Sequence, residues 1–172
     1  MKSTLIILRG NSGSGKSTIA KALQEHFGSG TMLIGQDAIR RNMLYLKDQP
    51  RNLAIELIHQ IALFGNGKCE VVIVEGILTA QRYGDMLREV LAAFDNRAAV
   101  YYFDLPFEET VKRNETRERS KKFGEESLKK WWNPKDFLHV ENEKAITETM
   151  SKEQILQMII QDVEQLKKEV SS

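Results

Sequence analysis

The sequence has very little cysteine. Its 172 residues include only Cys69, so an intramolecular disulfide bond is excluded. Long apolar runs are also missing: segments such as 5–8 hold a few apolar residues, whereas a membrane-spanning helix needs about 20. The apolar stretch before Arg9 is likewise too short for the hydrophobic part of a secretion signal. We therefore expect a cytoplasmic protein that does not insert into a membrane.

An excess of charge of one sign is absent too. The chain has 25 Lys and Arg residues against 24 Asp and Glu residues, which gives a net charge of +1. That balance argues against a protein built mainly to bind nucleic acid or an anionic membrane. The three histidines lack the spacing of metal ligands. With 41% apolar and 28% charged residues, the composition is that of a globular protein, and the length fits one domain over residues 1–172.

Short apolar runs alternate with segments of helical periodicity. The runs predict strands at 4–8, 31–34, 70–74 and 98–103. The helical spacing predicts helices at 17–27, 37–46, 52–64, 80–94, 106–119 and 151–170, and the last one opens with a capping box at 151–154. This alternation predicts an α/β fold of three layers, with a parallel sheet covered by helices on both faces.

A phosphate-binding motif follows the first predicted strand. The segment Gly-Asn-Ser-Gly-Ser-Gly-Lys-Ser at 10–17 matches the P-loop pattern G-x-x-x-x-G-K-[ST]. Its glycines allow backbone N–H groups to converge on a phosphate at the positive end of the next helix. Lys16 is expected to reach the β- and γ-phosphates of ATP, and Ser17 to bind Mg²⁺. The predicted nucleotide-binding residues are Gly10, Asn11, Ser12, Gly13, Ser14, Gly15, Lys16, Ser17 and Thr18. The alternative is a glycine-rich turn that binds nothing.

Three acidic residues follow predicted strands. Glu75 ends the third one, and because ligands bind beyond the carboxyl ends of parallel strands, we predict it as a second Mg²⁺ ligand, in the Walker-B position. A capping or surface carboxylate is the alternative. Asp37 is a candidate to accept a proton from the phosphate acceptor, and it is also placed to cap the helix that follows. Asp104 precedes Leu105 and Pro106, and we interpret it mainly as a helix cap.

From Ile6 to about Ile160, these motifs resemble the P-loop kinase family that includes phage-type polynucleotide 5′-kinase, chloramphenicol phosphotransferase, gluconate kinase and the zeta-toxin kinases. In that family an aspartate follows the P-loop by about twenty residues and an arginine comes three positions later, as Asp37 and Arg40 do here. The resemblance implies that Asp37 is the general base and that Arg40 holds the acceptor or its phosphate. It also implies the strand order 2-3-1-4-5, with a fifth strand at 144–147.

The resemblance further implies a helical lid at about 111–130. The family has a strand ending in Asp-Leu-Pro and then a helix whose arginines close over ATP. Here the sequence 104–106 is followed by Arg113 and Arg117, which are i,i+4 neighbours, and by the basic residues Arg119, Lys121 and Lys122. A solvated helix face is the alternative interpretation of this segment. The adjacent Trp131 and Trp132 either stack on a base or aromatic acceptor or belong to the edge of the core.

Three functions are consistent with these patterns. The favoured one is a kinase that uses ATP and Mg²⁺ to phosphorylate a small-molecule acceptor. The alternative is a polynucleotide or nucleoside kinase, which the Asp37 and Arg40 spacing suits, although the near-zero net charge does not favour nucleic acid as a partner. The third is a regulatory ATPase or GTPase; the Asn-Lys-x-Asp motif of guanine-binding switches is missing from the sequence.

Overall fold

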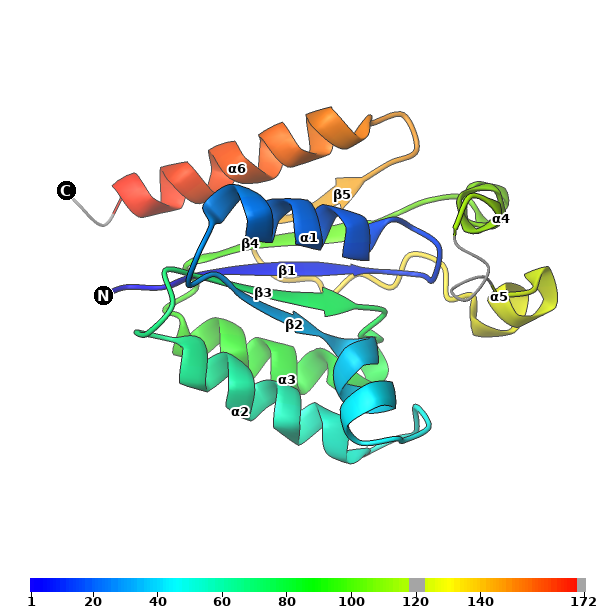
Figure 1. Ribbon diagram of the computed structural model, residues 1–172, viewed down its shortest axis with the longest axis horizontal. Helices are drawn as coiled ribbons and strands as arrows, with labels where there is room; N and C mark the ends of the chain where they lie inside the picture. Colours follow the sequence, from blue (N-terminus) through cyan, green and yellow to red (C-terminus); the bar gives the residue numbers. More distant parts are fainter. Residues whose placement is uncertain (118–122, 170–172) are drawn as a thin grey trace.

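The computed structural model describes residues 1–117 and 123–169. A parallel sheet forms its middle layer, with strands in the order β2-β3-β1-β4-β5 (Figure 1). This confirms the predicted fold class and strand order. The strands are β1 (Thr4–Gly10), β2 (Met32–Gly35), β3 (Val71–Gly76), β4 (Ala98–Phe103) and β5 (Glu143–Ile146).

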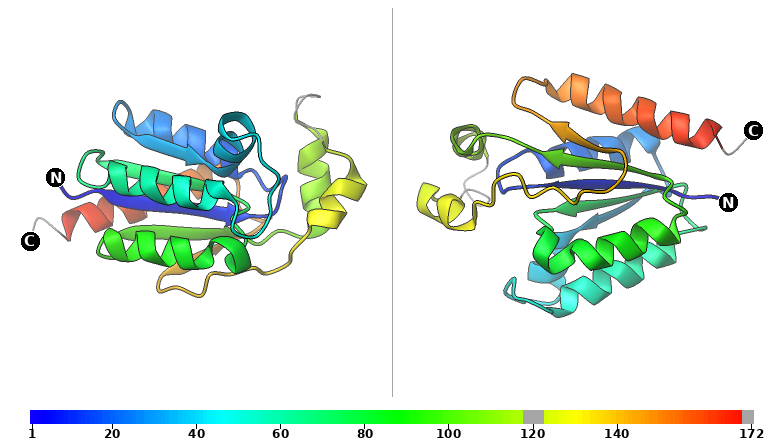
Figure 2. Two further views of the ribbon diagram at one scale, coloured as in Figure 1. Left: turned by 90° about the horizontal axis from the view of Figure 1, so that it is seen from below. Right: turned by 180° about the vertical axis from the view of Figure 1, so that it is seen from behind.

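Helices cover both faces of the sheet. α1 and α6 lie on one face and α2 and α3 on the other, whereas α4 and α5 lie beyond the carboxyl ends of the strands (Figures 1 and 2). The capping box at the start of α6 is present as predicted. The helices are α1 (Lys16–Phe27), α2 (Leu53–Gly65), α3 (Ala80–Ala93), α4 (Phe107–Glu115), α5 (Glu125–Trp131), α6 (Lys152–Lys168) and the π-helix η1 (Ala38–Met43).

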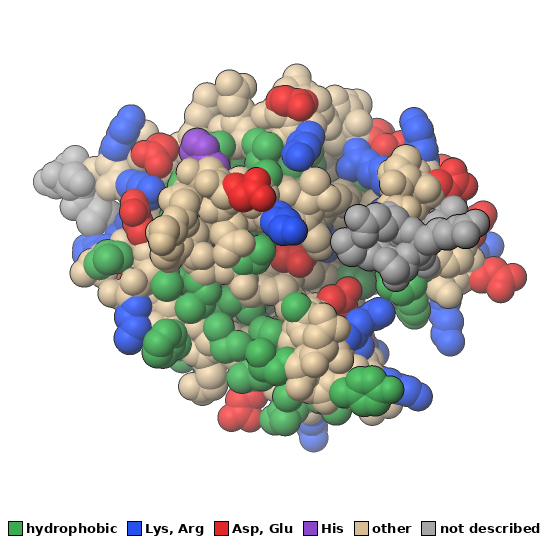
Figure 3. Space-filling view, viewed as in Figure 1, with side chains coloured by type: hydrophobic (Ala, Val, Ile, Leu, Met, Phe, Trp, Pro, Cys, Tyr) green, Lys and Arg blue, Asp and Glu red, His purple; other side chains and the backbone are tan. Residues whose placement is uncertain are grey.

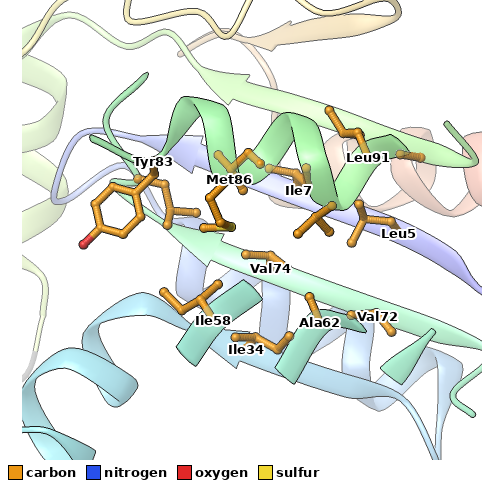
Figure 4. Packing of buried hydrophobic residues seen from close by; sticks show 14 of the residues in the cluster. Leu5, Ile7, Ile34, Ile58, Ala62, Val72, Val74, Tyr83, Met86 and Leu91 are labelled. Carbon is orange, nitrogen blue, oxygen red and sulfur yellow. The ribbon is translucent and has the colours of Figure 1, made fainter. Parts of the chain in front are cut away.

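Side chains that alternate along the strands fill two separate cores. On the α2–α3 face, residues such as Leu5 and Val74 pack against Ile58 and Met86 of the helices (Figure 4). On the opposite face, the intervening strand residues pack against α1 and α6. Every residue of β1 is buried, as expected for a central strand of a parallel sheet. This packing fixes the carboxyl ends of the strands at one edge, where the P-loop begins.

Two predicted helices differ from the observed ones. The segment 37–46 forms the shorter η1, in which the Leu44 N–H donates to the carbonyl five residues back, at Ile39. The predicted helix 106–119 ends at Glu115, and the buried side chain of Asn114, in its last turn, bonds the Phe123 backbone. Residues 118–122, which include the predicted lid residues Arg119, Lys121 and Lys122, lie outside the described residues.

The two ends of α4 both correct the sequence interpretation. Arg117 lies beyond the end of the helix, so Arg113 and Arg117 do not share one helical face. Asp104 does not cap α4: the residue that precedes the helix is Pro106, and no side chain caps the helix start. The Asp104 carboxylate instead accepts a hydrogen bond from the Lys135 amine at 3.0 Å.

The outer surface of α2 carries large apolar side chains among polar ones. Leu53 and Phe64 are exposed there, and hydrophobic side chains gather over this helix in the space-filling view (Figure 3). The helix has only 13 residues. Across the described ranges, no helix has both the length and the apolar character that crossing a membrane requires.

Candidate active site

A pocket of about 720 Å³ lies at the carboxyl edge of the sheet. It brings together residues from the P-loop, the end of β3, the start of η1, the α4 region and α6. Most of the predicted site residues are among those that line it. The lining residues are Ser12, Gly13, Ser14, Gly15, Lys16, Ser17, Thr18, Ile19, Lys21, Asp37, Glu75, Gly76, Ile77, Phe103, Arg113, Thr116, Arg117, Phe123, Met150, Lys152 and Ile155.

The P-loop lies directly against α4. Gly13 has a φ of +80°, and a Cβ atom there would stand 2.7 Å from the carbonyl oxygen of Thr110. Both features require glycine, since an L side chain is strained at this φ and would also overlap the α4 backbone. Of the nine predicted nucleotide-binding residues, 12–18 line the pocket, whereas Gly10 and Asn11 are not among the lining residues.

Lys16 is buried at the start of α1. Its Nζ donates to the carbonyl of Asn11 at 2.8 Å and to the hydroxyl of Ser14 at 3.0 Å. Burial lowers the pKa of Lys16 to about 8, while the charges of Glu75 and Asp37 act in the opposite direction. The amine is therefore held inside the loop next to the space that the P-loop glycines surround, as binding of a phosphate oxygen requires.

Ser17 and Glu75 contact each other across the pocket. The Ser17 hydroxyl donates to both carboxylate oxygens of Glu75, at 3.2 and 3.3 Å. Burial raises the pKa of Glu75, and the charge of Lys16 opposes that rise. A hydroxyl and a carboxylate suit Mg²⁺, which usually takes one or two carboxylates and completes its shell with water and phosphate oxygens. Within residues 1–117 and 123–169, no group of three or more His, Cys, Asp or Glu residues is arranged so that it could hold a metal ion.

Asp37 presents its carboxylate to the same pocket. Its side chain is 62% exposed, and its Oδ1 lies 3.2 Å from Nη2 of Arg40 and 3.5 Å from Nε of Arg41. The predicted capping role is wrong, because Asp37 makes no side-chain hydrogen bond to the start of η1. Glu75, and not Asp37, bonds the Ser17 hydroxyl, although the charge of Asp37 also acts on Glu75 and Lys16.

The two predicted lid arginines have different surroundings. Arg113 donates from Nη1 to the Ser14 carbonyl at 2.9 Å and from Nε to Glu109 at 2.9 Å, so it fastens α4 to the P-loop backbone. Arg117 lines the pocket, and its charge contributes to lowering the pKa of Lys16. Its positive charge therefore acts on the interior of the P-loop.

Two hydrogen bonds between the Asn11 side chain and the Asn133 backbone connect the P-loop to the chain that follows α5. Asn11 Nδ2 donates to the Asn133 carbonyl at 2.8 Å, and the Asn133 N–H donates to Asn11 Oδ1 at 2.8 Å. The Tyr102 hydroxyl donates to the same carbonyl at 3.2 Å. Sequence reasoning assigned Asn11 only to the nucleotide. Its side chain bonds a residue 122 positions away, and no local sequence pattern predicts that contact.

Sequence reasoning also missed Arg9. This arginine is fully buried, and it donates to the Leu78 carbonyl, the Asp136 carbonyl and the Asp136 carboxylate at 2.8–3.0 Å. Burial lowers the pKa of Arg9, while Asp136 and Glu143 raise it. The sequence signal that could have indicated a buried ion pair was an arginine at the end of an apolar run, directly before the first P-loop glycine. The ion pair fixes the segment after α5 against the centre of the sheet.

The paired tryptophans pack within the α4–α5 region. Trp131 meets Phe123 edge-to-face at 5.2 Å between ring centroids, and Trp132 meets Phe107 in the same manner at 5.5 Å. Trp131 remains 41% exposed. Neither tryptophan is among the residues that line the pocket.

Comparison with known proteins agrees with this geometry. A family model described as "AAA domain" (AAA_33) matches residues 5–132. The chain belongs to this family. The matched part of this AAA-domain chain contains the P-loop, Asp37, Glu75 and both arginines of the α4 region. No curated protein sequence matches the chain significantly.

Solved structures share the fold along nearly the whole chain. A gluconokinase from Sinorhizobium meliloti 1021 has 17% identity and a TM-score of 0.69, with 99% of this chain and 97% of that chain covered. The Mycobacterium tuberculosis APS kinase, solved in complex with AMPPNP and APS, has 16% identity and a TM-score of 0.67, with 95% and 98% covered. The tunicamycin resistance protein of Deinococcus radiodurans has 15% identity and a TM-score of 0.62, with 94% and 95% covered. The resemblance to P-loop kinases is thus confirmed for the fold.

Proposed function

We propose that the protein is an ATP-dependent phosphotransferase that moves the γ-phosphate of ATP to a hydroxyl group of a small-molecule acceptor. One observation carries the proposal: a single pocket contains both a P-loop with a buried lysine and an exposed carboxylate, Asp37, held beside arginines. A phosphate site and a proton acceptor in one pocket are the two requirements for transfer to a hydroxyl.

The nucleotide half of the pocket consists of residues 12–18 with Glu75. The backbone N–H groups of the loop and the Lys16 amine would bind the phosphates, and Ser17 and Glu75 would hold Mg²⁺. The bound cation would offset the phosphate charge. Arg113 keeps the loop in place, and Arg117 supplies positive charge near the transferred group. Because Arg113 and Arg117 both lie at the pocket, we retain the expected lid at 111–130 as part of the proposal of a single kinase domain.

The acceptor half is centred on Asp37. The acceptor hydroxyl would give its proton to a carboxylate oxygen of Asp37 while the hydroxyl oxygen forms its bond to the γ-phosphorus and ADP departs. Arg40 and Arg41 supply positive charge beside this carboxylate. The chain is thereby proposed as a phosphotransferase with an alcohol acceptor, and a cytoplasmic location stays part of that proposal.

A small acceptor is favoured over a polynucleotide. The gluconokinase and the APS kinase match over 97% and 98% of their lengths, whereas a chain of an RNA repair complex matches over 42% of its length with a TM-score of 0.54. The balanced charge of the chain also offers little general attraction for nucleic acid. A regulatory ATPase needs no carboxylate placed to accept a proton from a second substrate.

The test is ATP consumption in the presence of Mg²⁺ with a panel of acceptors. The panel includes nucleosides, 5′-hydroxyl oligonucleotides, sugars, nucleotide sugars and hydroxylated antibiotics. We expect low basal hydrolysis that rises strongly with one class of acceptor. Tight retention of nucleotide with no stimulation by any compound would contradict the proposal and favour a regulatory ATPase.

A further inference from the structure

Asn11 contacts the P-loop lysine through its backbone and a distant segment through its side chain. It is buried, and it is not among the residues that line the pocket. Its carbonyl accepts a hydrogen bond from the Lys16 amine at 2.8 Å. Its side-chain amide exchanges two hydrogen bonds with the backbone of Asn133, both at 2.8 Å, and we call these two bonds the clasp. One residue thus connects the lysine of the phosphate site to the chain that follows α5.

The position of the Lys16 amine depends on the atoms that hold it. A lysine ends in a point charge with three N–H donors on a flexible stem, so its hydrogen-bond acceptors decide where that charge lies. Among the residues that the structure describes, those acceptors are the Asn11 carbonyl and the Ser14 hydroxyl. A third N–H is then left for a phosphate oxygen. A shift of the Asn11 carbonyl would therefore move the charge that faces the phosphates.

The segment at the other end of the clasp is itself firmly attached. The Tyr102 hydroxyl, from β4, donates to the Asn133 carbonyl at 3.2 Å. Three residues later, the carbonyl and the carboxylate of Asp136 accept hydrogen bonds from the buried Arg9 at 2.8 and 2.9 Å. The same carboxylate accepts a hydrogen bond from the Ala80 N–H at 2.9 Å. Because these bonds connect the segment to β1, β4 and the start of α3, the clasp joins the P-loop to a fixed point of the fold.

Both acceptors of the Lys16 amine belong to loop residues that the α4–α5 part of the chain fastens. Ser14 is held from α4, because Arg113 donates to its carbonyl at 2.9 Å. Asn11 is held by the residue that lies two positions after the end of α5. The two ends of the expected lid are therefore attached to the two loop residues that place the lysine.

We propose that Asn11 is a positioning residue for Lys16: its clasp to the backbone of Asn133 fixes the carbonyl that holds the lysine amine at the phosphate site. The inference rests on the nucleotide-binding part of the proposed function, and it does not depend on which acceptor is used. It deepens that function, because it makes the chain after α5 part of the machinery that binds phosphate. Arg9 supports this role by anchoring the same segment at Asp136.

The chain offers a matched pair of variants at residue 133. The clasp uses only the backbone of this residue, and its side chain is exposed. Asn133→Ala therefore retains both bonds and should leave nucleotide binding unchanged. Asn133→Pro removes the N–H that donates to Asn11, and the extended backbone of Trp132, with ψ of 124°, accommodates a proline at the next position. Asn11→Ala removes both bonds from the loop side.

The readout is the affinity for a non-hydrolysable ATP analogue with Mg²⁺, measured by calorimetric titration. Asn11→Ala and Asn133→Pro should each weaken binding by about threefold to tenfold, the usual net effect of one hydrogen bond. Combining them should cost no more than Asn11→Ala alone, because both break the same clasp. In a Lys16→Ala background, Asn11→Ala should have no further effect, since it acts through the lysine.

A merely structural role of Asn11 gives a different pattern. Asn11→Ala would then weaken binding equally with and without the lysine, and that result would overturn the inference, as would unchanged affinity in Asn11→Ala or equal losses in Asn133→Ala and Asn133→Pro. Thermal melts show whether each variant is folded, and the Asn11 and Lys16 variants decide the matter alone if Asn133→Pro does not fold. The expected pattern without transfer to any acceptor would support the inference while the proposed function fails. Wild-type protein that binds no nucleotide would overturn both.

Discussion

The proposed nucleotide half and the proposed acceptor half of the pocket are built differently. In the nucleotide half, Lys16 is buried and the loop is held through its backbone, because Arg113 bonds a loop carbonyl and Gly13 leaves no room for a side chain. In the acceptor half, Asp37 is largely exposed and is held by ion pairs with neighbouring side chains. Under the proposed function, phosphate binding would be fixed by the fold, whereas acceptor choice would depend on a few side chains that are replaceable without disturbing it.

The largest effect is expected in the nucleotide half, from Lys16→Ala. Phosphoryl transfer should fall to the limit of detection, because the Lys16 amine is held inside the loop by Asn11 and Ser14. The fold should persist, since the substitution removes a buried charge. A transfer assay and a thermal melt followed by circular dichroism measure the two effects, with Lys47→Ala as the exposed control. Unchanged transfer in Lys16→Ala would remove the P-loop from the mechanism.

The matching change in the acceptor half is Asp37→Asn. It should lower kcat by about 10²–10⁴-fold, the usual contribution of a general base, and leave the KM for ATP within about twofold. Glu75→Gln is the contrasting variant, and it should mainly weaken the use of ATP with Mg²⁺. Steady-state kinetics in both substrates distinguish the two patterns. A loss of ATP binding in Asp37→Asn would place Asp37 in the nucleotide half.

A smaller effect tests whether the fold fixes the phosphate site. Gly13→Ala introduces both a strained φ and an overlap with the Thr110 carbonyl, and it should lower the free energy of unfolding by about 2–4 kcal/mol. Gly30→Ala is its matched control: φ is +87° and no atom lies within 4 Å, so only the backbone cost of about 1 kcal/mol remains. Thermal or denaturant unfolding measures both. Equal losses would show that α4 does not press on the loop.

The smallest effect is a pH dependence confined to the nucleotide half. Because burial lowers the pKa of Lys16 to about 8, the amine loses its proton as the pH rises through 8, and the affinity of the free protein for ATP should decline by up to about tenfold per unit above that value. Lys16→Arg should bind ATP with a flat profile over the same range. Equilibrium titrations between pH 7 and 9.5 test this, and a flat wild-type profile would contradict it.

The lowered pKa of Lys16 affects stability in the opposite direction: stability should rise with pH where the affinity for ATP declines. Between pH 8 and the ordinary lysine pKa of 10.5, the unfolded chain binds more protons at residue 16 than the folded protein does. The contribution of Lys16 to the free energy of unfolding therefore rises with pH over that interval, in protein without nucleotide. The difference between wild-type protein and Lys16→Ala in denaturant unfolding at pH 7.5 and 9.5 isolates this contribution.

The residues of the proposed nucleotide half were found in the sequence because their signals are local. The P-loop motif, the strand before it and the helix after it occupy consecutive residues, and Glu75 ends an apolar run of its own. Asp37 was located through the resemblance, and the structure places it in the same pocket. The strand order also followed from the resemblance and is confirmed.

The contacts that join distant residues, in either half of the pocket, were less predictable. The Arg41–Phe123 contact spans 82 positions, and the Asn11–Asn133 pair spans 122. Periodicity also failed where local hydrogen bonds departed from helical spacing. The Ile39–Leu44 bond makes η1 a π-helix, and α4 ends at Glu115, before Arg117. No local pattern identifies a side chain that will leave its helix for a partner on another segment.

The fate of the γ-phosphate tests the central claim most directly. The protein is incubated with γ-labelled ATP, Mg²⁺ and the acceptor that stimulates ATP consumption most, and the labelled products are separated. If the pocket joins a nucleotide half to an acceptor half, the label appears on the acceptor in the wild-type protein and is largely lost in Asp37→Asn. Label found only in inorganic phosphate, with every acceptor present, would contradict the claim and indicate an ATPase without an acceptor site.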